Sequence, residues 1–359
     1  MKTRVQILGL SFSLVLLIVT FFVYHRLSRD LPPSPPNSSR IPVNDSIPRI
    51  THAHNHCRSI YNYICSGNPE TSDPTGNVRP DIEGEKQAQL LQKKLIADHP
   101  DWNSDQIDDS LVNQIYSPVR TNRLISTFLW VRNTLEEIIN LQIKLSFAEK
   151  NRILATIERV ELEIPPPAAV YSDERELFTK NEVYFERTQE NKLRLRVGGA
   201  YLIIAKSWFN IVFTLAHELA HSIDPCELKN SGYVLASYQK LKVCFLQNGL
   251  ISTASITQEC GPRDQFAEVF ADWMAVQVTA RALKSYSHTF GKLQMVNSTK
   301  NAVKDLCRQE NDDEELELDL HPSPELRIEK IFGAHPEIRE FLGCGPATLT
   351  LNYCSLESR

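Results

Sequence analysis

The longest uninterrupted run of apolar positions lies at the amino-terminal end of the chain. Residues 5–24 contain no acidic or basic side chain. At about 1.5 Å of rise per residue, a helix of this length spans a hydrocarbon core about 30 Å thick. The pattern therefore predicts a single membrane-spanning signal-anchor helix over residues 5–24, preceded by a short cytoplasmic tail at 1–4. A cleaved signal peptide is the alternative, but its apolar region would be shorter and no small-residue cleavage pattern follows this run.

Residues 25–56 have the opposite character, because they include the proline- and serine-rich sequence LPPSPPNSSRIPVNDSIPRI. Proline and serine at this density disfavour both helix formation and core packing, so the segment is typical of a semi-rigid extended spacer. We therefore expect a stalk over residues 25–56, which holds a folded domain at residues 57–359 away from the membrane.

Apolar spacing in the folded domain is mostly helical. It recurs through residues 82–160, in the sequences ISTFLWVRNTLEEIINLQIKL and AEKNRILATIERVELEI, and again in IVFTLAHELAHSIDP and RDQFAEVFADWMA. The sequence KLRLRVGGAYLII alternates instead in the manner of a strand. With 42% hydrophobic and 23% charged residues the chain can bury a full-sized core. The pattern predicts a mainly α (α+β) fold with a small sheet.

The charge balance of the chain limits the kinds of binding partner, and its cysteines indicate the cellular compartment. The chain has 39 basic and 44 acidic side chains, which argues against a nucleic-acid partner. All eight cysteines follow the apolar run, and an even number suits disulfides in an oxidising compartment. Sequons at Asn37, Asn44 and Asn297 are compatible with glycosylation there. We expect a type II membrane protein whose domain is extracellular or lumenal, or a secreted protein if the apolar run is cleaved. A cytosolic domain with reduced thiols and the opposite topology is the remaining alternative.

The sharpest chemical signal is the H-E-x-x-H pattern formed by His217, Glu218 and His221 within an apolar helical run. Residues four apart lie on one face of a helix, so both imidazoles can reach one zinc ion. Glu218, beside the first histidine, can act as a general base toward water. An ordinary core helix with polar residues is the alternative reading, and a buried zinc helix satisfies both readings.

A catalytic zinc ion takes a third protein ligand, and Glu268 is the best candidate. Glu268 and Asp272 are four residues apart in a mostly apolar segment. Buried carboxylates need partners, which zinc ligation by Glu268 and a hydrogen bond from the His217 ring to Asp272 would provide. A surface helix with two solvated acids is the alternative.

These residues resemble the zinc-binding pattern of the neprilysin and endothelin-converting-enzyme family, in which H-E-x-x-H precedes E-x-x-x-D on a second helix. The resemblance extends to LHPSPELRIEKIFGAHPEIREFLGC, whose His321 and Arg327 match the family spacing. It implies a zincin, thermolysin-like domain with one Zn²⁺ per chain. It also implies that His321 donates to the oxyanion of the tetrahedral intermediate and that Arg327 binds the substrate backbone.

The opening segment CRSIYNYIC is also similar to that of the family. By this resemblance Cys57 pairs with Cys344, Cys65 with Cys307 and Cys244 with Cys354, which leaves Cys226 to pair with Cys260. The substrate-pairing edge strand of the family is matched only by Asn181 and Tyr184, and Asn181 is expected to hold substrate backbone.

Length separates the chain from full members of this family. Cys57–Arg359 spans 303 residues, too few for both the catalytic domain and the complete second helical domain that closes over the site. We therefore expect a membrane-anchored zinc metalloendopeptidase with most of this lid missing, acting on peptide or protein substrates. A catalytically inactive ectodomain that serves as a binding module is the alternative function.

Overall fold

The computed structural model describes residues 56–66, 80–142, 144–164, 175–204, 206–252, 260–261, 265–307, 321–345 and 354. The predicted tail, membrane helix and all of the stalk but its last residue lie outside these ranges. Within the described ranges, no helix combines the length and the apolar character needed to cross a membrane.

The described chain is mainly helical with one small sheet, as the hydrophobic spacing predicts. The α-helices are α2 (Ile60–Cys65), α3 (Pro80–Asp98), α4 (Ser104–Ile115), α5 (Pro118–Leu141), α6 (Phe147–Glu158), α8 (Gly199–Ile203), α9 (Trp208–His221), α10 (Pro225–Asn230), α11 (Ala236–Gln247), α13 (Phe266–Tyr286), α14 (Lys292–Ala302) and α15 (Pro336–Phe341). The shorter turns are η1 (His56–Arg58), η4 (Arg175–Thr179), η5 (Lys304–Leu306) and a π-helical turn η6 (Leu326–Phe332). The strands are β1 (Val160–Glu163), β2 (Val183–Arg187) and β3 (Leu193–Val197).

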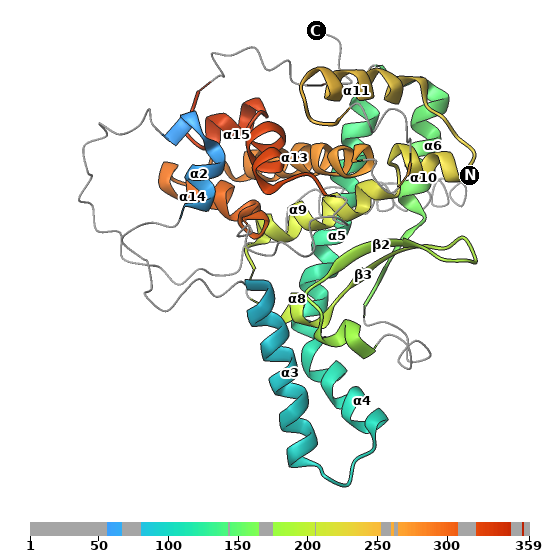
Figure 1. The fold of residues 1–359 in the computed structure, drawn as a ribbon, viewed down its shortest axis with the longest axis vertical. Helices are drawn as coiled ribbons and strands as arrows, with labels where there is room; N and C mark the ends of the chain where they lie inside the picture. The colour runs from blue at the N-terminus through green and yellow to red at the C-terminus, as the bar shows by residue number, and fades with distance from the viewer. Residues whose placement is uncertain are drawn as a thin grey trace, which may run out of the picture. The chain divides into compact units, whose positions relative to one another are not determined.

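The core is built around α9 and α13, which lie side by side (Figure 1). The Ser207 hydroxyl accepts the Asn210 N–H at 3.1 Å and so caps the first turn of α9. Nearly the whole circumference of α9 is buried, which is the pattern of a helix in the centre of a core. The pair therefore places its few polar side chains in a water-poor environment.

The sheet has the strand order β1-β3-β2, with β1 parallel and β2 antiparallel to β3. Gly198 N–H donates to the Glu182 carbonyl, and Thr188 N–H donates to the Lys192 carbonyl. Because hydrogen-bonded and non-hydrogen-bonded pairs alternate in an antiparallel ladder, the backbone groups of Phe185 point away from β3. Among the described strands, β2 is thus an edge with outward backbone groups.

The structure corrects one predicted element. The helical pattern expected across residues 148–164 ends at Glu158, and Val160–Glu163 forms strand β1 instead. The sequence V-E-L-E alternates apolar and polar residues with the period of a strand, and parallel pairing with β3 satisfies its backbone. The strand-like segment 192–204 is likewise a strand only to Val197, after which α8 begins.

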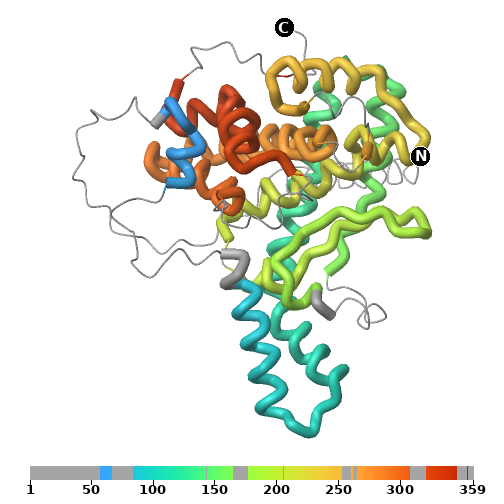
Figure 2. Tube along the Cα trace, viewed as in Figure 1, coloured from blue at the N-terminus to red at the C-terminus, as the bar shows by residue number. Residues whose placement is uncertain are grey.

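A second, smaller core joins α3 and α4 to α8 and η4. Figure 2 traces α3 and α4 as an antiparallel helical hairpin. The buried residues of this second core are Ala88, Leu95, Ile107, Leu111, Val112, Ile115, Tyr116, Phe178 and Ala200. The Tyr116 hydroxyl also donates to the Val197 carbonyl at 2.9 Å, which ties this core to the end of β3.

The turn from β3 into α8 requires glycine. A Cβ atom at Gly199 would lie 2.1 Å from the Phe178 carbonyl oxygen, whereas one at Gly291 would meet nothing within 4 Å. We expect Gly199→Ala to lower the free energy of unfolding by about 1–3 kcal/mol, because backbone must move to admit the methyl group. Gly291→Ala is the control and should lose less stability in urea, because no atom must move and only the preference of the α14 N-cap for glycine over alanine is lost. Equal stability of the two variants would contradict the close approach at Gly199.

All four expected disulfides are present: Cys57–Cys344, Cys65–Cys307, Cys226–Cys260 and Cys244–Cys354. No cysteine is left free. The first two hold η1 and α2 against the carboxy-terminal part of the fold. The third connects α10 to the segment before α13, so it joins the chain after the H-E-x-x-H helix to the chain before the helix that carries Glu268.

Candidate metal centre

The two histidines of α9 face the same space. His217 and His221 lie one helical turn apart, and their Nε2 atoms are 3.2 Å from each other. Only 6% of the His217 side chain and 15% of the His221 side chain are exposed. Because neither ring can rely on water, each must find its partners within the protein.

Helix α13 brings a carboxylate to the same space. Glu268 Oε2 lies 3.3 Å from His217 Nε2, and Glu268 Oε1 lies 3.5 Å from His221 Nε2. The other acid of this helix, Asp272, lies one turn further along and reaches the opposite nitrogen of His217. Its Oδ1 is 2.9 Å from His217 Nδ1. The expected relation of Asp272 to His217 is therefore present in the geometry.

Asp224 has the same relation to the second histidine, with Oδ2 3.1 Å from His221 Nδ1. Sequence reasoning missed this residue. A signal was available, since an aspartate before Pro225 is typical of a helix N-cap, and Asp224 caps α10. With a carboxylate at each Nδ1, each Nδ1–H can donate to its carboxylate, and both Nε2 atoms face Glu268, where a bound metal would take their lone pairs.

These spacings fit a tetrahedral zinc ion. Ligand atoms about 2.0–2.1 Å from such an ion lie about 3.3–3.4 Å from one another. The two imidazole Nε2 atoms are 3.2 Å apart, Glu268 Oε2 is 3.3 Å from His217 Nε2, and Glu268 Oε1 is 3.5 Å from His221 Nε2, so each carboxylate oxygen lies at about this spacing from one imidazole. Glu268 Oε2 is also buried and, within the part of the chain that the structure describes, makes no hydrogen bond of good geometry. Two histidines, one carboxylate and a further carboxylate behind each imidazole form a donor set suited to zinc.

The pKa shifts of the site residues also favour a bound cation. Burial alone would lower the pKa of His217, but the carboxylates of Asp272 and Glu268 beside its ring outweigh burial and raise the pKa to about 9. The pKa of His221 is likewise raised, by Asp224 and Glu268 against the effect of burial. Burial would raise the pKa of Glu268, yet the surrounding imidazoles hold it far below its usual range. The carboxylates of Glu268, Asp272 and Asp224 therefore favour positive charge at the position of the two imidazoles.

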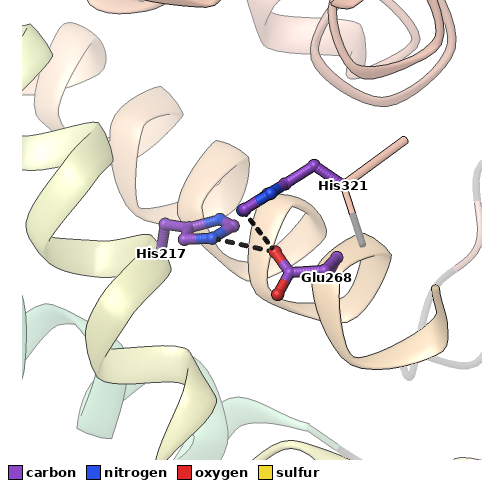
Figure 3. A group of neighbouring side chains, drawn as sticks. All are labelled: His217, Glu268 and His321. Atoms are coloured by element: carbon purple, nitrogen blue, oxygen red, sulfur yellow. Dashed lines mark ion pairs between the residues drawn. The ribbon is translucent and has the colours of Figure 1, made fainter. Parts of the chain in front are cut away.

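His321 approaches the same carboxylate from another direction (Figure 3). Its Nε2 lies 3.0 Å from Glu268 Oε2, so His217, Glu268 and His321 also form a set of three possible metal ligands. We favour His221 over His321 as the third ligand because the His321 side chain is 44% exposed. The side chain of His221 is only 15% exposed, and its ring contacts Asp224. His321 then lies beside the site, where its predicted role as a hydrogen-bond donor requires it.

Glu218 follows His217 on α9 and contacts the sheet. Its Oε2 accepts the backbone N–H of Phe185 at 3.1 Å. This N–H is one of the outward groups of the β2 edge, so the contact fixes the carboxylate beside that edge. Sequence reasoning did not find this contact, because no local pattern predicts which backbone group a side chain 33 residues away will meet.

Arg327 lies in η6, where Gly333 N–H donates to the carbonyl of Ile328 five residues earlier. Its Nε donates to Asp272 Oδ2 at 2.7 Å and its Nη2 to Asp272 Oδ1 at 2.8 Å. This bidentate pair, together with His217, keeps the pKa of Asp272 well below its usual range despite burial. Substrate binding by Arg327 stays a prediction, and the remaining N–H groups of the guanidinium are the ones that could serve it.

Asn181 lies two residues before β2, where its N–H donates to Glu85 Oε1 at 3.2 Å. Its side-chain oxygen is buried and has no hydrogen-bond partner in the described ranges. The position is next to the edge strand, as expected, and its contact with substrate stays a prediction.

Comparison of the sequence with protein-family models gave no match, and comparison with curated proteins gave none either. The geometry of the chain's own residues therefore carries the functional argument.

Proposed function

We propose that this protein is a zinc metalloendopeptidase with a zincin, thermolysin-like catalytic domain similar to those of the neprilysin and endothelin-converting-enzyme family. The observation that carries the proposal is the convergence of His217, His221 and Glu268 at the ligand spacing of a tetrahedral ion. Glu218, beside the first ligand, adds the base that such a site needs for hydrolysis.

In this proposal His217, His221 and Glu268 hold one zinc ion. When bound there, the ion would act as a Lewis acid toward a peptide carbonyl and would make a water molecule more acidic. Asp272 and Asp224 orient the two imidazoles by accepting their Nδ1–H groups. They are positioning residues, since neither reaches the reacting atoms.

Glu218 is the general base. Its Oε2 is engaged by Phe185 N–H, which leaves Oε1 to take a proton from the attacking water and deliver it to the leaving amine nitrogen. His321 donates an N–H to the oxygen of the carbonyl as negative charge develops there. Its position against Glu268 supports this role.

The free edge of β2 supports binding of an extended peptide. Outward backbone groups at Val183 and Arg187 can pair with a substrate strand, while the N–H of Phe185 between them is taken by Glu218. Asn181, at the start of this edge, would add a side-chain amide to the pairing. Arg327 would bind the substrate backbone through the N–H groups that Asp272 does not take.

We also propose that the domain is extracellular or lumenal and is tethered by the apolar segment at residues 5–24, or is secreted after its cleavage. Four disulfides and no free thiol support an oxidising compartment. Asn297 of the third sequon is exposed on α14. The proposed partners are a peptide or protein substrate and the membrane.

Metal removal tests the function directly. The full chain should contain about one zinc ion and should cleave members of a quenched fluorescent peptide library. Dialysis against a chelator should abolish cleavage, and stoichiometric zinc should restore it. Cleavage that survives complete zinc removal would contradict the proposal. Full zinc occupancy without cleavage of any peptide would favour the binding-module alternative.

A further inference from the structure

The short helix α10 follows the zinc helix after three residues and controls the carboxylate behind His221. Asp224 caps α10, and its Oδ1 accepts the N–H groups of Cys226 and Glu227 at 2.7 Å each. The other oxygen, Oδ2, faces His221 Nδ1. The orientation of the His221 ring thus depends on where α10 lies.

A disulfide connects α10 to the segment that precedes α13, the helix that carries Glu268. Cys226 is bonded to Cys260, which lies eight residues before Glu268 in the chain. Cys260 has φ of 64°, in the left-handed region that non-glycine residues seldom adopt. The bond therefore holds a backbone conformation that the segment would not favour by itself.

An ion pair connects α10 to the edge strand. The guanidinium of Arg187, at the end of β2, donates to Glu227 Oε1, and its Nη2 also donates to Ser231 Oγ at 2.7 Å. The ion pair is largely buried, since only 22% of the Arg187 side chain and 11% of the Glu227 side chain are exposed. Arg187 lies two residues after Phe185, whose N–H holds Glu218. One short helix thus has contacts to His221, to the Glu268 segment and to the strand that holds the base.

We propose that α10 is the positioning element of the metal centre, and that the Cys226–Cys260 disulfide fixes His221 relative to Glu268 and so slows the release of zinc. This inference rests on the proposed function, because it assumes that these two residues share a zinc ion. Two ligands on different helices hold an ion tightly only while the helices keep their spacing. The Cys226–Cys260 disulfide shortens the covalent path between His221 and Glu268.

The chain offers a matched control. Cys244–Cys354 closes a longer loop than Cys226–Cys260, with a sequence separation of 110 against 34. Loss of the longer loop should therefore reduce global stability more. Neither Cys244 nor Cys354 belongs to α10. If the Cys226–Cys260 disulfide only stabilises the fold, removal of Cys244–Cys354 should do more damage. If it positions the ligands, removal of Cys226–Cys260 should cause the greater loss of zinc.

The test compares Cys226→Ala/Cys260→Ala with Cys244→Ala/Cys354→Ala in the zinc-loaded full chain. Alanine is used at each site so that no new thiol can bind the metal. The rate of zinc transfer to a coloured chelator and the midpoint of thermal unfolding are measured for each. We expect the first variant to release zinc about tenfold faster than the wild type, and the second to release it at the wild-type rate although it unfolds at a lower temperature.

Two further variants keep the test decisive. Cys226→Ala/Cys260→Gly removes the bond without a side chain in the left-handed region, and should release zinc as fast as the double-alanine variant. Glu227→Gln keeps the disulfide but weakens the contact to Arg187, and should give an intermediate rate. Wild-type release rates in all of these variants would overturn the inference while zinc binding stands. A wild-type chain without zinc would overturn the proposed function together with it.

Discussion

Replacing Glu218 with glutamine is expected to lower kcat for peptide hydrolysis by about 10²–10⁴-fold, the usual contribution of a general base. The amide oxygen of glutamine can still accept the Phe185 N–H, so the local geometry should persist. It cannot accept and deliver the proton that hydrolysis requires. Zinc content should be unchanged, because Glu218 is not among the three converging ligands.

The matched control is Glu190→Gln, on the turn between β2 and β3. The Glu190 side chain is 74% exposed and pairs only with Lys192 in the described structure. Its loss should leave kcat and zinc content as in the wild type. Measurement of kcat and KM on one cleaved peptide, with zinc per chain by elemental analysis, decides the matter. A Glu218→Gln variant with the wild-type rate would exclude Glu218 as the base.

Asp272→Ala is expected to have the largest combined effect on stability and metal binding. Asp272 is 1% exposed and supports both His217 and Arg327. Its removal leaves the buried guanidinium without a counter-ion, which costs about 3–5 kcal/mol of unfolding free energy. It also frees the His217 ring, which should weaken zinc binding by about 10–100-fold.

The double variant Asp272→Ala/Arg327→Met separates these effects. Removing the guanidinium together with its partner should recover much of the lost stability, because no charge is left unpaired. Zinc affinity should stay low, since nothing then holds His217 Nδ1. Urea unfolding and competition with a zinc chelator provide the two readouts. Recovery of zinc affinity in the double variant would contradict the orienting role of Asp272.

Local sequence pattern predicted the elements that carry the candidate chemistry. The apolar surroundings of His217 and Glu268 indicated two buried helices, and α9 and α13 are buried. Helical spacing also predicted the mainly helical domain. It failed at Val160–Glu163, where an adjacent helix obscured a period-two pattern and where pairing with β3, which is distant in sequence, decides the structure.

The motif spacing predicted the contact between His217 and Asp272, but it did not predict two other contacts between distant segments. The pairs Phe185–Glu218 and Asp272–Arg327 join residues 33 and 55 positions apart. Which groups meet across such separations depends on how helices and strands pack, and that information is absent from local periodicity. Asp224 is different, because its capping position next to Pro225 was legible in the sequence.

The measurement that tests the central claim most directly is zinc-edge X-ray absorption spectroscopy of the zinc-loaded full chain. The account predicts a single kind of site in which two imidazole nitrogens lie about 2.0–2.1 Å from the ion. His221→Ala should remove one imidazole from the spectrum, and His321→Ala should leave both in place. Loss of an imidazole in His321→Ala, or a wild-type spectrum without imidazole, would contradict a site formed by His217, His221 and Glu268.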